Sequence, residues 1–177
     1  MARRVFFSFH FENDVMRAAQ VRNSNVITSG GVDANGFIDA AQWESIKRSS
    51  DQAIKNWINE QLKNTSVTVV LIGSQTVDPI SGQVRPWIKY EIDRSIDSGN
   101  GLVGVRIHNA PDPRYGVDCA GINPFDALTF SGTSTKLSNR YHTYDWVAQN
   151  GRVNLGNWIE QAAIDAGKRE LSRSLFK

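Results

Sequence analysis

Cysteine and long apolar runs are both scarce in this sequence, and each absence excludes a class of protein. Cys119 is the only cysteine among 177 residues, so no internal disulfide can form, and we expect a reducing compartment. No stretch approaches the roughly 20 consecutive apolar residues that a membrane-spanning helix requires. The apolar run Val5–Phe9 is followed at once by His10, Glu12 and Asp14 and is too short for a secretory signal. We therefore expect a cytoplasmic protein with no membrane partner.

An excess of charge of one sign is also missing. The chain has 20 Lys and Arg against 18 Asp and Glu, which gives a formal net charge of +2. The basic residues are scattered and never form a run longer than two. Because nucleic-acid binding normally requires a concentrated basic surface, we predict no nucleic-acid partner. The length and the ordinary composition, 40% hydrophobic and 21% charged, predict a single folded domain over residues 1–177.

Several motifs that would identify an enzyme class are absent. The sequence contains neither G-x-G-x-x-G nor G-x-x-x-x-G-K-[ST], which disfavours a Rossmann dinucleotide site and a P-loop. It has no G-x-S-x-G, so an α/β-hydrolase nucleophile is not expected. The histidines His10, His108 and His142 and the single cysteine show no metal-ligand spacing, and we predict no metal site.

What is present is an alternation of strand and helix patterns. Apolar runs predict strands at Val5–Phe9, Val67–Ile72, Leu102–Ile107 and Tyr141–Val147. Amphipathic patterns predict helices over residues 15–21, through Trp43 and Ile46, over 53–62, from Pro86 up to Gly99, and over 157–166.

Shorter signals predict the ends of these elements. Asn13 or Asp14 is expected to cap the first helix after a polar loop. Asp39 and Ser49 each stand three residues before a glutamine, the spacing of a capping box, at the start of the next two helices. Asn25–Thr28 is interpreted as a short edge strand.

Strands of five or six residues that alternate with helices imply parallel pairing and right-handed crossovers, hence an open α/β sheet. Ligands of such sheets bind beyond the carboxyl ends of the strands, where the strand order reverses. The loops after Phe9 and Ile72 are the candidates. They are expected to bring His10, Ser74 and the helix that carries Glu91 toward one crevice.

The stretch WIKYEIDRSI holds the acid of greatest interest. Ile88, Ile92 and Ile96 form an apolar stripe, whereas Trp87 and Glu91 lie four residues apart on a neighbouring face. Trp87 is a candidate substrate contact, with core or interface packing as the alternative. The other tryptophans are expected to pack in the core.

A lone carboxylate suffices for one kind of glycosidic cleavage. Glycoside hydrolysis normally needs a second acid to protonate the departing oxygen. A pyridinium such as nicotinamide leaves as a neutral molecule, so that second acid is dispensable. Glu91 is therefore a candidate to hold ribose hydroxyls and to offset the positive charge of an oxocarbenium ion. The alternative is a solvated helix acid that pairs with Arg85 or Arg94.

Several segments together resemble a known family. RVFFSFHFEND, FIDAAQWE, VTVVLIGSQT, WIKYEI, NPFD and YDWV, in this order and spacing, resemble the TIR-like proteins of bacterial Thoeris anti-phage systems, within the TIR superfamily. The resemblance covers most of the chain. It implies a flavodoxin-like fold with about five parallel strands and helices on both faces. It further implies that NAD+ is a substrate rather than a cofactor and is cleaved between nicotinamide and ribose to a cyclic or modified ADP-ribose.

The resemblance also implies roles for individual residues. The family's catalytic glutamate falls on Glu91. The loop after the first strand, Ser8, Phe9 and His10, corresponds to the wall that holds the nucleotide, and Ser74 approaches from the third strand. Residues 22–36 do not align with the mobile loop of TIR domains, and no binding residue is predicted there.

The family further implies partners. A phage component is expected as the trigger, and the product is expected to act as a second messenger on a separate effector protein. Self-association on activation is expected as well, because TIR sites are commonly completed by a neighbouring molecule.

Two other classes of function remain open at this point. A nucleoside deoxyribosyltransferase-like enzyme also sets a glutamate beside a flavodoxin-like sheet, but it would act on nucleosides and ignore NAD+. A non-catalytic TIR scaffold would signal by assembly and tolerate the loss of Glu91. Substrate profiling and substitution of Glu91 separate the three.

Overall fold

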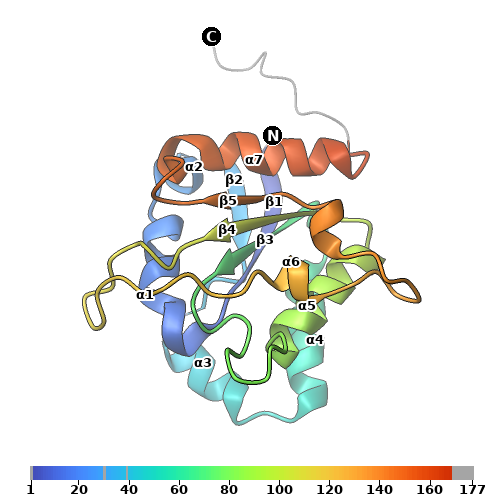
Figure 1. Ribbon diagram of the computed structural model, residues 1–177, viewed down its shortest axis with the longest axis horizontal. Coiled ribbons are helices and arrows are strands. Elements are labelled where there is room, and N and C mark those ends of the chain that lie inside the picture. The colour runs from blue at the N-terminus through green and yellow to red at the C-terminus, as the bar shows by residue number, and fades with distance from the viewer. Residues whose placement is uncertain (1, 30, 39, 169–177) are drawn as a thin grey trace.

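A computed structural model describes residues 2–29, 31–38 and 40–168 of the chain (Figure 1). Asp39, the predicted cap of a helix, lies outside these residues. In chain order the elements are β1 (Arg3–Ser8), α1 (Phe11–Arg22), α2 (Asn25–Thr28), β2 (Val32–Asn35), α3 (Ala40–Lys47), α4 (Asp51–Leu62), β3 (Val67–Ile72), α5 (Pro86–Asp97), β4 (Gly101–Arg106), α6 (Pro124–Ala127), the 3-10 turn η1 (Leu137–Asn139), β5 (Thr143–Asp145) and α7 (Gly151–Asp165).

The five strands form one sheet in the order β2-β1-β3-β4-β5, and every neighbouring pair is parallel. In the centre of the sheet Val5 of β1 lies opposite Val67 of β3, which in turn lies opposite Gly101 of β4. This strand order is the flavodoxin-like one. It confirms the predicted open parallel sheet, and it puts the reversal of strand order between β1 and β3.

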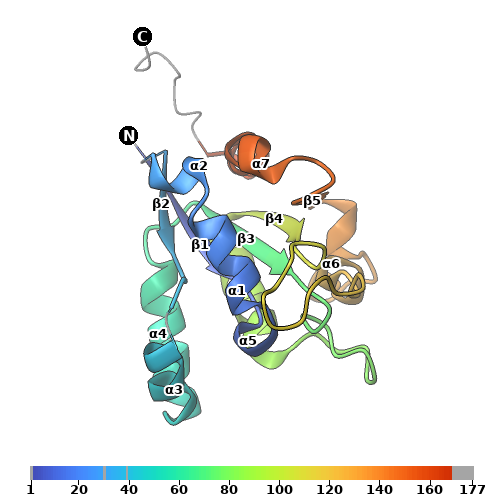
Figure 2. The ribbon, with the colours of Figure 1, turned by 90° about the vertical axis from the view of Figure 1, so that its left-hand side faces the viewer.

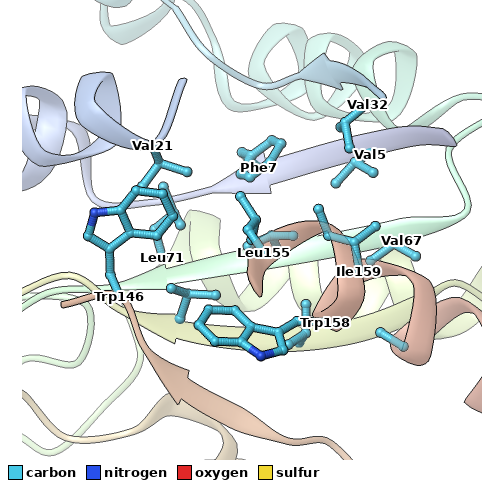
Figure 3. Close-up of a cluster of buried hydrophobic side chains, with 14 of the residues drawn as sticks. Val5, Phe7, Val21, Val32, Val67, Leu71, Trp146, Leu155, Trp158 and Ile159 are labelled. Carbon is cyan, nitrogen blue, oxygen red and sulfur yellow. The ribbon is translucent and has the colours of Figure 1, made fainter. Parts of the chain in front are cut away.

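One face of the sheet is covered by α1 and α7. Side chains alternate along a strand, so Val5 and Phe7 of β1 point to this face. Figure 3 shows Leu155 and Ile159 of α7 packed over them, and all four side chains are at most 1% exposed. The side chains between this face and its helices form the largest of the three described hydrophobic clusters, which includes Trp158.

The opposite face is covered by α4 and α5, and Figure 2 shows α4 on the side of the sheet away from α7. Phe6 of β1 packs against Ile58 of α4, and Val70 of β3 packs against Ile92 of α5. The prediction of helices on both faces is therefore confirmed. Ser8 follows Phe6 by two residues, so the same alternation directs its side chain toward α5.

The predicted edge strand was wrong. Asn25–Thr28 forms the short helix α2, and the edge strand is Val32–Asn35 instead. Asp, Ala and Asn have low strand propensity, so the sequence V-D-A-N carries little strand signal. Pairing with β1, beginning with Val32 opposite Arg3, imposes the strand. Gly36, with φ of +91°, follows it in a conformation that side chains disfavour.

Two predicted helix starts were misplaced. The first helix begins at Phe11 rather than after Asp14, and its N-cap is His10, whose side chain makes no capping hydrogen bond. Acids in the first turn favour this start through the helix dipole. The helix α4 is capped by Ser50, not Ser49, because the Ser50 hydroxyl accepts a hydrogen bond from the backbone N–H of Ala53.

The last elements also differ from expectation. Strand β5 ends at Asp145, because its carboxylate accepts hydrogen bonds from the backbone N–H groups of Val147 and Ala148 and turns the chain. Helix α7 begins at Gly151, earlier than the predicted residue 157. At 15 residues α7 is the longest helix of the described chain, and none of the described helices is long and apolar enough to span a membrane.

Candidate functional site

A cavity of about 360 Å³ lies beyond the carboxyl end of β1, between the first turns of α1, α4 and α5 and the helix α3. Its size falls in the usual range for small-molecule sites, about 300–1,000 Å³. Much of the wall is aromatic, formed by Phe9, Phe11, Trp43, Trp57 and Trp87. Charged and titratable side chains complete it, namely His10, Glu12, Lys47, Asp51, Arg85 and Glu91.

Glu91 lies in the wall of this cavity because it belongs to the buried stripe of α5. The buried residues of that helix are Ile88, Glu91, Ile92 and Ser95, which follow the i, i+3, i+4, i+7 spacing of one helix face. The side chain is 9% exposed. The Ser8 hydroxyl, directed to this face by the alternation of β1, donates a hydrogen bond of 2.5 Å to the Glu91 Oε2.

The surroundings of Glu91 favour its neutral form. Burial raises the pKa of the Glu91 carboxyl to about 8, and the hydrogen bond from Ser8 acts in the opposite direction. Among the described ion pairs neither arginine is joined to Glu91: Arg85, although it lines the same cavity, pairs with Asp78, and Arg94 pairs with Asp97. The alternative of a solvated acid paired with one of these arginines is therefore wrong. A buried carboxyl with a strongly raised pKa in a cavity is typical of functional sites.

His10 lies on the same wall, at the N-cap of α1. Burial lowers the pKa of its imidazole, and the nearby charge of Arg85 lowers it further. Its Nδ1 atom is buried without a hydrogen-bond partner among the described residues. A neutral imidazole with an unused nitrogen can donate to or accept from a ligand in the cavity.

Phe9 and Trp87 provide apolar surface at the same place. Phe9 lies 6.3 Å from Phe11 between ring centroids, and Trp87 meets Tyr90 edge to face at 6.3 Å. Flat aromatic walls of this kind suit a planar ring of a ligand. Four of the predicted site residues, Phe9, His10, Trp87 and Glu91, thus line one cavity, and Ser8 contacts it through Glu91.

Comparison with known proteins now identifies the family. Residues 6–112 match the family model described as "Thoeris protein ThsB, TIR-like domain". The chain is also 39% identical over 160 residues to the "Putative cyclic ADP-D-ribose synthase ThsB1" of Bacillus cereus (strain MSX-D12). The aligned region covers 90% of this chain and 76% of that protein. This chain belongs to the Thoeris ThsB TIR-like family. The predicted resemblance is therefore confirmed.

Sequence reasoning missed part of the cavity of this ThsB-family chain. Trp43 was expected in the core but lines the cavity, where its ring stacks on Phe11 at 5.1 Å, and Trp57 packs against the α4 cluster as expected but lines the cavity as well. The expectation of core packing holds for Trp146 and Trp158, which are 3% and 9% exposed. The spacing of Trp43 and Lys47 could have indicated that α3 lines a site, because residues one helical turn apart put an aromatic ring and a cation on one face of the helix.

Ser74 of this ThsB-family chain does not line the cavity that contains Glu91. Its hydroxyl donates a hydrogen bond of 2.8 Å to Asp118, and Asn13 donates to both residues. The fully buried Arg17 lies beside this group, where its Nη1 is 3.2 Å from the Asp118 carboxylate and its Nη2 donates to the Gly116 carbonyl. These contacts tie the loop before residue 119 to α1. Ser74 thus takes part in a structural network at a separate position.

The part of the ThsB-family chain that the structure describes offers no metal centre. Within residues 2–29, 31–38 and 40–168, no three or more His, Cys, Asp or Glu side chains converge as metal ligands.

Proposed function

We propose that this protein cleaves NAD+ between nicotinamide and ribose and releases a cyclic or otherwise modified ADP-ribose. The observation that carries the proposal is the buried carboxyl of Glu91, held by Ser8 in the wall of an aromatic cavity. The name of the Bacillus cereus relative, a cyclic ADP-D-ribose synthase, supports the same chemistry. NAD+ is consumed as a substrate and is not a cofactor.

In the reaction the bond between the ribose C1′ and the pyridinium nitrogen breaks, and its electron pair stays on the nitrogen. Nicotinamide leaves neutral, and the ribose becomes an oxocarbenium ion. The Glu91 carboxylate stabilises that positive charge and holds the ribose hydroxyls. A nucleophile of the ADP-ribose itself then closes a ring, whereas attack by water would give the linear product. The aromatic walls contributed by Phe9 and Trp87 keep water away and favour ring closure.

The raised pKa of Glu91 fits a cationic substrate. With a pKa of about 8 the carboxyl is mostly protonated in the empty cavity at neutral pH. The positive charge of the nicotinamide ring favours the carboxylate, so binding of NAD+ lowers this pKa and releases the proton to solvent. The reactive form of Glu91 therefore arises when the substrate is in place.

The biological setting that we propose is supported by membership of the family. We propose that a phage component triggers the enzyme in the cytoplasm, that the chain self-associates on activation, and that the product is a second messenger that activates a separate effector protein. Family membership supports these statements. The proposal includes neither a nucleic-acid nor a membrane partner.

The test is to incubate the purified protein with NAD+, with and without lysate from phage-infected cells, and to identify products by mass spectrometry. Glu91→Gln should abolish nicotinamide release, because the amide cannot become a carboxylate. Asp97→Asn is the matched control, an exposed carboxyl at the end of the same helix, and should keep full activity.

The other outcomes identify the rival functions. Turnover that survives in Glu91→Gln would move the active site elsewhere. Absence of turnover in every condition would favour a non-catalytic scaffold, and turnover of nucleosides without NAD+ would favour a deoxyribosyltransferase-like enzyme.

A further inference from the structure

Two oppositely charged side chains meet at the cavity that contains Glu91. Glu12 stands in the first turn of α1 and Lys47 is the last residue of α3, and the Lys47 Nζ lies 2.6 Å from the Glu12 Oε1. Both line the cavity, and both side chains are 54% exposed. An ion pair between side chains this exposed contributes little to stability. A ligand with its own negative charge can therefore replace Glu12 at low cost.

The electrostatic field at this cavity favours an anion. Three helices begin at its wall, α1 at Phe11, α4 at Asp51 and α5 at Pro86, and the N-terminus of each helix carries a partial positive charge. Arg85 adds a full charge. Its Nε and Nη2 donate to the backbone oxygen and the Oε1 of Gln75, at 3.0 and 3.1 Å, which fixes the guanidinium group in place.

The charged groups of the wall act on one another. Lys47 lowers the pKa of the Glu12 carboxyl, chiefly through their hydrogen bond, and His10 and Arg85 lower it further. Arg85 also acts on His10, whose pKa falls mainly through burial. With His10 neutral, Glu12 offsets the charge of Lys47, and Asp78, which lies outside the cavity wall, is 4.0 Å from the Nη1 of Arg85.

Helix α3 lies at the surface, and the exposed Lys47 has room to change partners. None of its residues is buried. Its contacts with the rest of the protein include the Trp43 ring on Phe11, the partly buried Ile46 beside the α4 cluster, and Lys47 itself. The Trp43 Nε1 is buried without a hydrogen-bond partner among the described residues. One face of α3 thus offers a ligand an ammonium group and an unused N–H donor.

We infer that Lys47 and Arg85 form a subsite for the diphosphate of the substrate, and that Glu12 holds Lys47 until the diphosphate replaces it. That the diphosphate belongs to NAD+ rests on the proposed function, whereas the subsite rests on the charges and contacts above. Entry of the substrate exchanges one ion pair for another, and the Glu12 carboxylate turns to solvent. Glu12 is therefore a built-in competitor for Lys47 that sets the affinity for the substrate.

The test is calorimetric titration of the full-length protein with ADP-ribose, and with adenosine as a probe that lacks the diphosphate. Lys47→Met should weaken ADP-ribose binding about tenfold, the size expected for a lost charge-assisted hydrogen bond. Glu12→Gln should tighten it a few-fold, because Lys47 loses its competitor. Adenosine binding should change in neither variant. Lys47→Arg keeps the positive charge, which can also bind a phosphate, and should bind ADP-ribose within about threefold of wild type.

The direction of the two effects separates the subsite from a structural role. If the ion pair only fixes α3, breaking it from either side weakens binding, and equal losses in Lys47→Met and Glu12→Gln would overturn the inference. Lys89→Met is the matched control, because Lys89 forms an equally exposed ion pair with Asp93 outside the cavity. A Lys47→Met affinity equal to that of this control, or no binding of ADP-ribose by wild type, would also overturn it.

The titration needs no turnover, so its outcome is independent of the proposed function. If ADP-ribose binding depends on Lys47 but the protein never cleaves NAD+, the inferred subsite is supported and the proposed enzymatic function is refuted. If the protein cleaves NAD+ and the KM is unchanged in Lys47→Met, the inferred subsite is refuted and the proposed enzymatic function is supported.

Discussion

At the scale of single residues, Glu91 combines a position in the wall of the candidate cavity with a cost in stability. A carboxyl group that is only 9% exposed loses the hydration that stabilises its charged form. Among the described contacts, one hydrogen bond from Ser8 to the carboxyl group partly compensates for the lost hydration. The folded protein therefore keeps Glu91 protonated over a pH range in which the unfolded chain has already released the proton.

This difference predicts how stability varies with pH. The pKa of Glu91 is about 8 in the folded protein against 4.5 for the exposed group. Between these values the folded state holds one more proton, so the free energy of unfolding falls as pH rises, by at most about 1.4 kcal/mol per pH unit. The loss begins near the lower value and is complete above the higher one. Glu91→Gln cannot ionise and should be a few kcal/mol more stable than wild type at about pH 9.

Urea unfolding of both proteins from about pH 4.5 to 9 measures this effect. The two curves should converge at the acidic end and separate as pH rises. Glu44→Gln, which alters an exposed acid of α3, should follow wild type throughout. Parallel curves for wild type and Glu91→Gln would mean that Glu91 is ionised in the folded state.

Sequence reasoning succeeded for side chains whose position follows from one strand end and one helix. Phe9 and His10 follow β1, and Trp87 and Glu91 lie on α5. Because ligands of parallel sheets bind beyond the carboxyl ends of the strands, the sequence predicted that these residues would lie at one cavity, as they do. It did not predict the hydrogen bond between Ser8 and Glu91, which joins residues 83 positions apart. Ser74 shows the limit of the rule, because its hydroxyl turns to Asp118 at a separate position.

At the scale of elements, α7 lies so close to β4 that one position has no room for a side chain. A Cβ added to Gly101 would stand 2.2 Å from the backbone oxygen of Ala162. Neither backbone can yield easily, because one is in the sheet and the other in a helix. Gly101→Ala should therefore lower the free energy of unfolding by about 1–3 kcal/mol or more, as overpacked cores do. Thermal unfolding followed by circular dichroism measures the loss.

Gly156 within α7 is the matched control. A Cβ there would meet only the Val26 Cγ1 at 3.5 Å, an ordinary contact. Alanine is favoured over glycine inside a helix, so Gly156→Ala should raise the free energy of unfolding by about 0.5–1 kcal/mol. If both substitutions changed the free energy of unfolding in the same direction, the contact between α7 and β4 would not be as close as described.

The elements that the sequence predicted well are those with strong internal patterns. Val67–Ile72 has five apolar residues and one β-branched threonine and forms β3 with those bounds, and α5 follows its isoleucine stripe from Pro86. Val32–Asn35 has no such pattern and became a strand only because β1 offers it a partner. Asn25–Thr28 has a β-branched core but folds as a helix, because Val26 and Ile27 pack into the cluster beneath α7.

At the scale of the whole molecule, one sheet supports every hydrophobic cluster. The α7 face and the α4–α5 face meet across β1 and β3, whose alternate side chains enter one cluster or the other. Loss of either layer would expose the strands that the other layer needs. We therefore predict that the two layers and the sheet between them unfold as one cooperative unit, as expected for the proposed single domain.

Fluorine NMR of protein labelled with 5-fluorotryptophan checks this prediction. Trp146 and Trp158 report on one face of the sheet, and Trp57 and Trp87 on the other. All four signals should lose intensity at the same urea concentration. Two separate midpoints, one for each face, would instead indicate that the layers unfold independently.

The sequence by itself determined the class of fold and the family, and it pointed to Glu91 as the acid for which we propose a catalytic role. These follow from local information, because apolar runs, helical spacing and turn residues act between neighbours in the chain. Tertiary structure decided the rest. It placed Glu91 in the buried stripe against Ser8, enclosed the cavity with Trp43 and Trp57, and moved Ser74 into a separate network. Burial, pKa and the exchange of charged partners depend on which segments meet across the sheet, and no local pattern specifies that meeting.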